Sequence, residues 1–149
     1  MKSDNHYMQL AIKEAEKAKA VNEYRVGAVI VKEGQILSSA YSLESLEMKH
    51  AEELAISKCG KYSLVNAILY CTMEPCNFRE SGKTPCSDLI INLKIKRVVF
   101  GVYDLDKPIN NITGYENLRR SNIEVFHLEC MEEEIKKITP ELFGVSLWR

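Results

Sequence analysis

One histidine, two cysteines and a glutamate in this 149-residue chain have the types and spacing of a zinc site that activates water. His50 and Glu52 stand two positions apart, and Cys76 and Cys86 follow. Zinc binds nitrogen and sulfur ligands tetrahedrally, so three protein ligands leave one position for a water molecule, whose pKa falls to about 7. A glutamate beside such a centre can accept and pass on a proton. The sequence therefore predicts a catalytic Zn2+ centre with His50, Cys76 and Cys86 as metal ligands and Glu52 as the catalytic residue.

A closed, structural zinc site is the alternative interpretation. The residues that could supply its fourth ligand are Cys59, Cys71, Cys130 and His127. Structural sites usually contain tight C-x-x-C knuckles, whereas nine residues separate Cys76 from Cys86. A structural site also has no use for Glu52. Both features favour the catalytic interpretation, and the three remaining cysteines are expected to pack in the core.

Helical and strand patterns alternate along the chain. Apolar residues recur at helical spacing from Asp4 to about Ala20, with Asp4 as the expected N-cap. Five strands are expected, over residues 26–31, 35–41, 66–72, 97–102 and 123–128. Four more helices are expected, over 50–58, from 84 onward, over 115–120 and over 131–142. This order predicts one α/β domain over residues 1–149. It is a three-layer α/β/α arrangement with a five-stranded mixed, mostly parallel sheet whose opening hairpin is antiparallel.

The expected elements place the four site residues at their ends. Cys86 falls in the first turn of a helix that begins with Thr84 as N-cap and Pro85, where free N–H groups favour a thiolate. His50 opens a helix, and residues two apart share a site only near a helix end. Cys76 follows a buried strand, at the carboxyl edge where parallel-sheet proteins place their sites. All four side chains are therefore expected at one edge of the sheet.

The composition excludes several classes of function. With 46% hydrophobic and 28% charged residues, the chain resembles a soluble globular protein, and no apolar run approaches the roughly 18 residues of a membrane span. The polar N-terminus lacks a signal-peptide core, which predicts a cytoplasmic protein. The net charge is −1 and the basic residues are scattered, so a nucleic-acid polymer is not expected as a partner. A small molecule is the expected substrate.

Several segments resemble the cytidine deaminase-like superfamily of zinc deaminases, whose signature combines H-x-E with P-C. These segments are Val26 to Val31, His50-Ala51-Glu52 and Thr72-Met73-Glu74-Pro75-Cys76. Other segments are similar to the riboflavin-biosynthesis branch in particular: Gly82 to Cys86, Arg97 to Gly101, Asp104, and Asn122 to Val125. The long stretch between the cysteines is also typical of that branch, and the resemblance extends from about Val26 to Phe143.

The resemblance implies hydrolytic deamination of a diaminopyrimidinone that carries a ribosyl-phosphate. His50, Cys76 and Cys86 would bind zinc and Glu52 would shuttle protons. Lys83 and Asp104 match substrate-contacting positions of that branch, although a solvated loop lysine and a turn cap are equally good readings of these two residues. Because members commonly assemble, a homodimer or homotetramer is expected.

The chain also departs from the pattern of that branch. Glu23-Tyr24 replaces an Asn-Pro pair, with Asn22 one place out of register, and Ser42 replaces a histidine. The family's Asp-Pro-Asn-Pro run becomes the segment 104–108, which includes Asp106. The stretch between the cysteines is one residue longer than usual, and no reductase domain follows in this sequence. Asn22, Glu23, Ser42 and Asp106 are therefore expected to be substrate-binding positions that set specificity.

Three functional hypotheses compete with deamination of an aminopyrimidine whose phosphate Lys83 would meet as a point charge. The first is a nucleoside, nucleotide or free-base deaminase that acts on cytosine or guanine. The second is a tRNA-editing deaminase, which the missing basic surface disfavours. The third is a catalytically silent, zinc-stabilised binding module, which has no need of Glu52.

Overall fold

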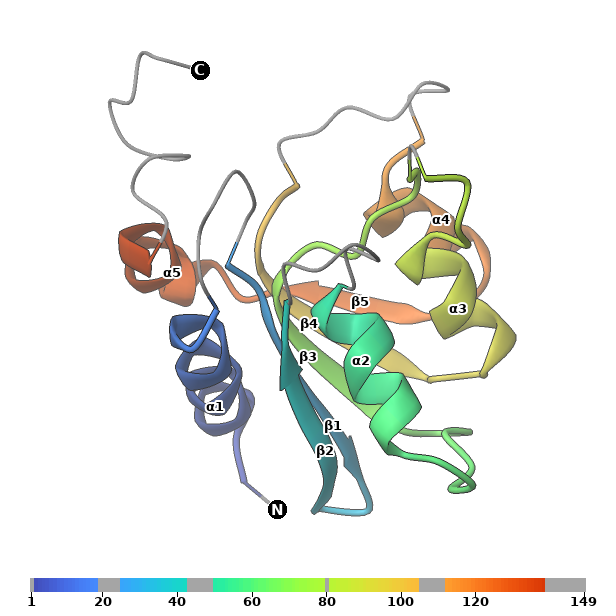
Figure 1. Ribbon diagram of the computed structural model, residues 1–149, viewed down its shortest axis with the longest axis horizontal. Coiled ribbons are helices and arrows are strands. Elements are labelled where there is room, and N and C mark those ends of the chain that lie inside the picture. The colour runs from blue at the N-terminus through green and yellow to red at the C-terminus, as the bar shows by residue number, and fades with distance from the viewer. Residues whose placement is uncertain (1, 19–24, 43–49, 80, 105–111, 139–149) are drawn as a thin grey trace.

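A five-stranded sheet with the strand order β2-β1-β3-β4-β5 forms the centre of the computed structural model, and helices cover both of its faces (Figure 1). The structure describes residues 2–18, 25–42, 50–79, 81–104 and 112–138. In chain order the elements are α1 (Asp4–Glu16), β1 (Gly27–Lys32), β2 (Gln35–Tyr41), α2 (Ala51–Lys58), β3 (Ile68–Met73), α3 (Cys86–Asn92), β4 (Arg97–Val102), α4 (Gly114–Arg120), β5 (Glu124–His127), a 3-10 turn (Glu129–Met131) and α5 (Glu132–Ile138). The predicted order of elements and the α/β fold are confirmed.

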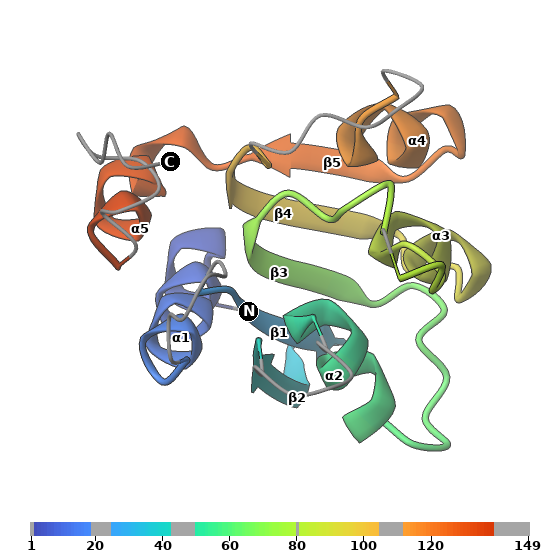
Figure 2. The same ribbon diagram turned by 45° about the horizontal axis from the view of Figure 1, so that its top comes forward.

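The sheet is mixed, as predicted. β1 pairs antiparallel with both β2 and β3, whereas β3 pairs parallel with β4, and β4 with β5. β2, β3, β4 and β5 therefore share one direction. Helices α1 and α5 lie on one face of the sheet and α2, α3 and α4 on the other (Figures 1 and 2). Every residue of the central strand β3 is buried.

Helix α1 packs closely on the sheet because β1 begins with a glycine. A Cβ atom at Gly27 would collide with the carbonyl oxygen of Ala11 in α1. The Gly27 N–H also donates to Thr72 Oγ1 at 3.1 Å, which ties β1 to β3. Any larger residue at this position would push α1 off the sheet.

Two predicted N-caps are wrong by one residue. Ser3, not Asp4, caps α1, since Ser3 Oγ accepts the His6 N–H at 3.2 Å. The Asp4 carboxylate instead accepts two hydrogen bonds from the Arg97 guanidinium, both at 2.8 Å. Pro85, not Thr84, is the N-cap of α3, so Cys86 is the first helical residue.

Three further expectations about packing and length can be compared with the structure. Cys59 and Cys71 are buried as predicted, whereas Cys130 is exposed, which contradicts its expected place in the core. Helix α1 ends at Glu16, short of the expected end near Ala20. The expected extension of the closing helix to residue 142 lies outside the described residues. Among the described helices, none has the length and apolar character needed to cross a membrane.

Candidate active site

Three element ends bring one nitrogen and two sulfur atoms together. His50 is the N-cap of α2, Cys76 follows the carboxyl end of β3, and Cys86 opens α3. His50 Nδ1 lies 3.5 Å from Cys76 Sγ and 3.5 Å from Cys86 Sγ, and the three atoms lie within 4.8 Å of one another. We call these three atoms the donor set.

The donor set fits a tetrahedral zinc ion. Nitrogen and sulfur ligands at about 2.1 and 2.3 Å from such an ion lie about 3.6 Å from each other, close to the observed separations. Among the described residues, three side chains contribute a metal-ligand atom to this cluster, and no fourth one joins them. The candidate fourth ligands have other surroundings: Cys59 Sγ lies 3.4 Å from the Ala55 carbonyl oxygen, and His127 Nε2 lies 3.0 Å from that of Gly101. A three-ligand centre with an open position is the arrangement typical of catalysis.

The two sulfur atoms differ in their electrostatic surroundings. A hydrogen bond from the Cys86 side chain, helped by others from His50 and the Cys86 backbone, lowers the pKa of Cys76 to about 4 despite burial. The Cys86 N–H donates to Cys76 Sγ at 3.3 Å. The pKa of Cys86 is raised, first by its bond to Cys76 and then by burial. The Cys86 side chain and the N–H at the start of α3 therefore both favour a thiolate at Cys76.

Glu52 lies in the first turn of α2 and is only 4% exposed. Burial raises the pKa of its carboxyl to about 7, with smaller contributions from the charges of Cys76 and Asp104, while His50 opposes the shift. A carboxyl whose pKa lies near neutral pH can both accept and donate a proton there. The predicted catalytic glutamate thus has suitable surroundings for proton transfer.

The predicted substrate-binding residues have different places. Asp104 follows β4 and interacts electrostatically with Glu52, which puts it beside the site. Lys83 is half-buried in the stretch that joins the two cysteines. Ser42 directly follows β2 at the end of the β1–β2 hairpin away from the turn, where its Oγ accepts the Val26 N–H at 3.1 Å. The remaining three, Asn22, Glu23 and Asp106, lie outside the described residues.

Glu74 is a residue whose role sequence reasoning missed. It is 4% exposed, and its two carboxylate oxygens accept the N–H groups of Asp104 at 3.0 Å and Tyr115 at 2.8 Å. A Cβ atom at Gly114 would collide with the Pro75 carbonyl oxygen, so the start of α4 lies directly on this segment. Glu74 therefore holds the segment after β4 and the start of α4 against the strand that delivers Cys76.

An ion pair also connects the stretch between the cysteines to the helix that carries the histidine. Arg79 Nη1 lies 3.4 Å from Glu53 Oε1, and the Arg79 side chain is 4% exposed. The same Glu53 oxygen accepts the His50 N–H at 3.3 Å. Because Glu53 bridges the two segments, it fixes the backbone of His50 relative to that stretch.

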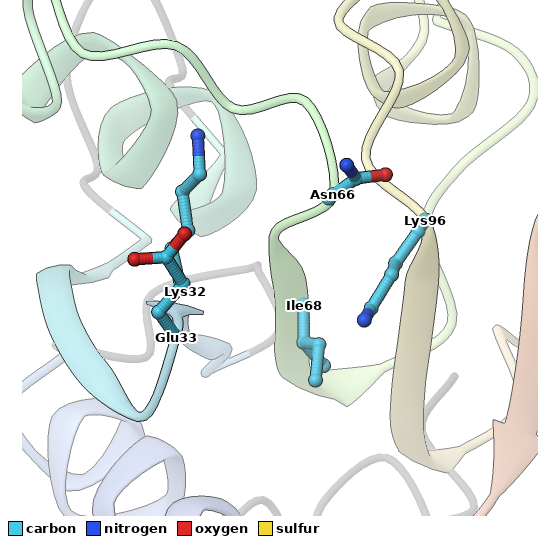
Figure 3. A pocket seen from close by; sticks show the side chains of 5 residues that line it. All are labelled: Lys32, Glu33, Asn66, Ile68 and Lys96. Carbon is cyan, nitrogen blue, oxygen red and sulfur yellow. The ribbon is translucent and has the colours of Figure 1, made fainter.

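A separate surface pocket lies at the opposite edge of the sheet. Figure 3 shows the side chains that line it: Lys32, Glu33, Asn66, Ile68 and Lys96. Ile68 is the first residue of β3, whereas Cys76 follows its last residue. This pocket is therefore not part of the donor set's surroundings.

Comparison with known proteins agrees with this geometry. Residues 1–102 match the family described as the cytidine and deoxycytidylate deaminase zinc-binding region. A diaminohydroxyphosphoribosylaminopyrimidine deaminase of Schizosaccharomyces pombe is 39% identical over 153 residues, which cover 95% of this chain and 38% of that protein. A tRNA-specific adenosine deaminase of Bacillus subtilis is 37% identical over 111 residues, which cover 70% of this chain and 65% of that protein.

A solved structure shares both fold and sequence with the chain. It is a diaminohydroxyphosphoribosylaminopyrimidine deaminase/5-amino-6-(5-phosphoribosylamino)uracil reductase of Thermotoga maritima, with a TM-score of 0.82 and 33% identity over 94% of this chain and 41% of the other. The chain spans about two fifths of the length of this protein and of the S. pombe relative. The chain belongs to the cytidine and deoxycytidylate deaminase family of zinc-binding proteins.

Proposed function

We propose that residues 1–149 act as one zinc-dependent deaminase domain on an aminopyrimidine-type small molecule. The proposed substrate is a diaminopyrimidinone ribosyl-phosphate or a close relative of it. The observation that carries the proposal is the three-atom donor set beside the buried carboxyl of Glu52. A purely structural metal site would not require an acid with this burial at its side.

Each residue has a defined part in the proposed reaction. His50, Cys76 and Cys86 would hold zinc, which when bound supplies a Lewis acid and a source of hydroxide at neutral pH. Glu52 would accept one proton from the attacking water and pass it to a ring nitrogen of the substrate. It would then carry the proton of the new C–OH group to the exocyclic amine, so that the C–N bond breaks, C=O forms and ammonia leaves. Asp104 beside Glu52 accepts hydrogen bonds from the substrate, and Lys83 meets a phosphate as a point charge.

The relatives support two substrate classes unequally. The S. pombe and T. maritima proteins are named for a phosphorylated diaminopyrimidine and align with nearly the whole chain. The B. subtilis protein is named for adenosine in tRNA and aligns with less of it. The exposed lysines Lys94 and Lys96 stand at the amino end of β4, away from the donor set, where they would not hold a polynucleotide at the site. A small molecule is therefore the better proposal.

Ammonia release by the zinc-loaded protein tests this proposal. The substrates compared would be the diaminopyrimidinone ribosyl-phosphate, cytosine and guanine compounds with their nucleosides, and an adenosine-containing tRNA. Turnover of the diaminopyrimidinone alone is expected. Turnover of another substrate would move the assignment to that class, and sedimentation of the same sample would test the proposed homodimer or homotetramer.

A Glu52→Gln variant tests the role of the carboxyl itself. We expect the variant to keep zinc and the fold while ammonia release falls by about 10²- to 10⁴-fold, since proton transfer is lost. Glu133→Gln, an exposed position on α5, is the matched control and should retain full activity. Loss of zinc from the Glu52 variant would instead indicate a structural role and argue against the enzyme.

A further inference from the structure

We propose that Asn117 is a positioning residue that holds the two cysteine segments at the spacing a zinc ion requires, although it contacts neither sulfur. Asn117 lies on α4, a helix that contributes no atom to the donor set. This inference rests on the proposed zinc function and extends it to a helix outside the sequence motifs.

The side-chain amide of Asn117 reaches both cysteine segments at once. Its Nδ2 lies 2.9 Å from Asn77 Oδ1, 3.1 Å from Ser87 Oγ and 2.9 Å from Asp88 Oδ1. Asn77 directly follows Cys76, and Ser87 directly follows Cys86. One NH2 group therefore donates to the residues next to both sulfur ligands.

The partners of Asn117 are themselves paired in a complementary way. Ser87, with no exposed surface, donates from its Oγ to Asn77 Oδ1 at 2.7 Å. Asn77 Nδ2 donates to the Ile112 carbonyl oxygen at 2.8 Å, which leaves Asn77 Oδ1 as the acceptor that faces Asn117. The Ser87 N–H donates to the Cys76 carbonyl oxygen at 3.0 Å. Ser87 is buried, and Asn77, Asp88 and Asn117 are half-buried. Loss of the Asn117 amide would remove a donor to Asp88 Oδ1 and leave Asn77 Oδ1 with the Ser87 hydroxyl, which weakens the link between the two segments.

The length of the stretch between the cysteines explains why such a tether is needed. In a C-x-x-C knuckle the short connection fixes the two sulfur atoms by itself. Here nine residues separate Cys76 from Cys86, and a connection of that length leaves the separation of its ends open. The direct bonds from Ser87 to Asn77 and Cys76 supply part of that constraint, and Asn117 adds to it from a neighbouring helix.

The test is the zinc affinity of Asn117→Asp in the full chain, measured by competition with a chromophoric chelator. The substitution preserves size but places a carboxylate oxygen against the Asn77 and Asp88 oxygens, so it repels where the amide attracted. We expect affinity to fall by about 10- to 100-fold, the usual effect of losing a group that orients metal ligands. The visible spectrum of the cobalt(II)-substituted variant should also change, because it reports the ligand geometry. Glu116→Gln on the exposed side of the same helix should match the wild type in both measurements.

Ser87→Ala is the second variant, chosen because it removes one hydroxyl and no amide. It should weaken zinc binding by a smaller factor than Asn117→Asp does. Circular dichroism of the metal-free proteins verifies that each variant is folded. Wild-type affinity and a wild-type cobalt spectrum in Ser87→Ala and in every folded Asn117 variant would overturn the inference and leave the proposed function standing. A wild-type protein that binds no zinc would overturn both.

Discussion

Replacement of Glu74 by glutamine should loosen the segment that carries Asp104. In the native protein the two carboxylate oxygens accept one N–H each, from Asp104 and from Tyr115. Glutamine keeps one acceptor and turns an NH2 group toward the second N–H. One backbone donor, in the enclosed region between β3 and α4, then loses its partner.

The expected destabilisation is about 2–3 kcal/mol. A hydrogen bond to a charged acceptor contributes about 1.5–3 kcal/mol, and a buried donor left without a partner costs about 1–3 kcal/mol. Removal of a buried carboxylate recovers part of this loss, because its desolvation cost disappears. At a denaturant slope of about 2 kcal/mol per molar urea, the unfolding midpoint should fall by about 1 M.

Urea unfolding of the metal-free protein, followed by circular dichroism, separates this effect from zinc binding. Glu116→Gln is the matched control, since its carboxylate is exposed and pairs with Arg120 at 3.8 Å. In activity assays, displacement of Asp104 should raise KM more than it lowers kcat. A loss of stability below about 0.5 kcal/mol, within the range of surface substitutions, would refute the reasoning.

Three other predictions follow from single contacts. Gly27→Ala should destabilise the protein by about 1–3 kcal/mol in thermal unfolding, because the new methyl group meets the Ala11 carbonyl oxygen; an unchanged Tm would contradict the close packing of α1. Asp4→Asn should lower stability at pH 7 by about 1–2 kcal/mol, since Arg97 loses a charged partner. Arg97 holds the pKa of Asp4 below its usual 3.8, so the difference from the wild type should be complete above about pH 4 and should shrink as the pH falls through the lower folded-state pKa; a difference that does not shrink at all below pH 4 would be inconsistent with this ion pair. Cys130→Ser should leave stability and zinc content unchanged because the thiol is exposed; loss of zinc would support the four-ligand alternative.

The sequence predicted those parts of the fold that depend on local pattern. The bounds of β2 and β4 agree with the strands expected over 35–41 and 97–102, since turn residues precede each of them. The donor set was also predictable, because histidine and cysteine at element ends have few structural uses. The α1 cap was not, because the Asp4 carboxylate is drawn to Arg97, a partner 93 residues away.

The residues that hold the site together were beyond sequence reasoning for the same reason. Asn117 stands on a short helix with no motif around it, and its partners lie 29 to 40 residues earlier in the chain. Glu74 was visible as part of a motif, but its bonds go to backbone N–H groups, which carry no sequence signal. Only the packing of α4 onto the segment after β3 identifies these contacts.

The wide separation of the donors along the chain has a consequence for folding thermodynamics. His50 precedes Cys76 by 26 residues and Cys86 by 36, and the three stand on different elements. An unfolded chain would have to close two long loops to chelate a metal, so it competes poorly with the native state for the ion. A ligand bound by the native state alone stabilises it by about 4 kcal/mol at a thousand times its dissociation constant. Zinc should accordingly bind after the sheet has formed and stabilise the folded protein, and it should not nucleate folding.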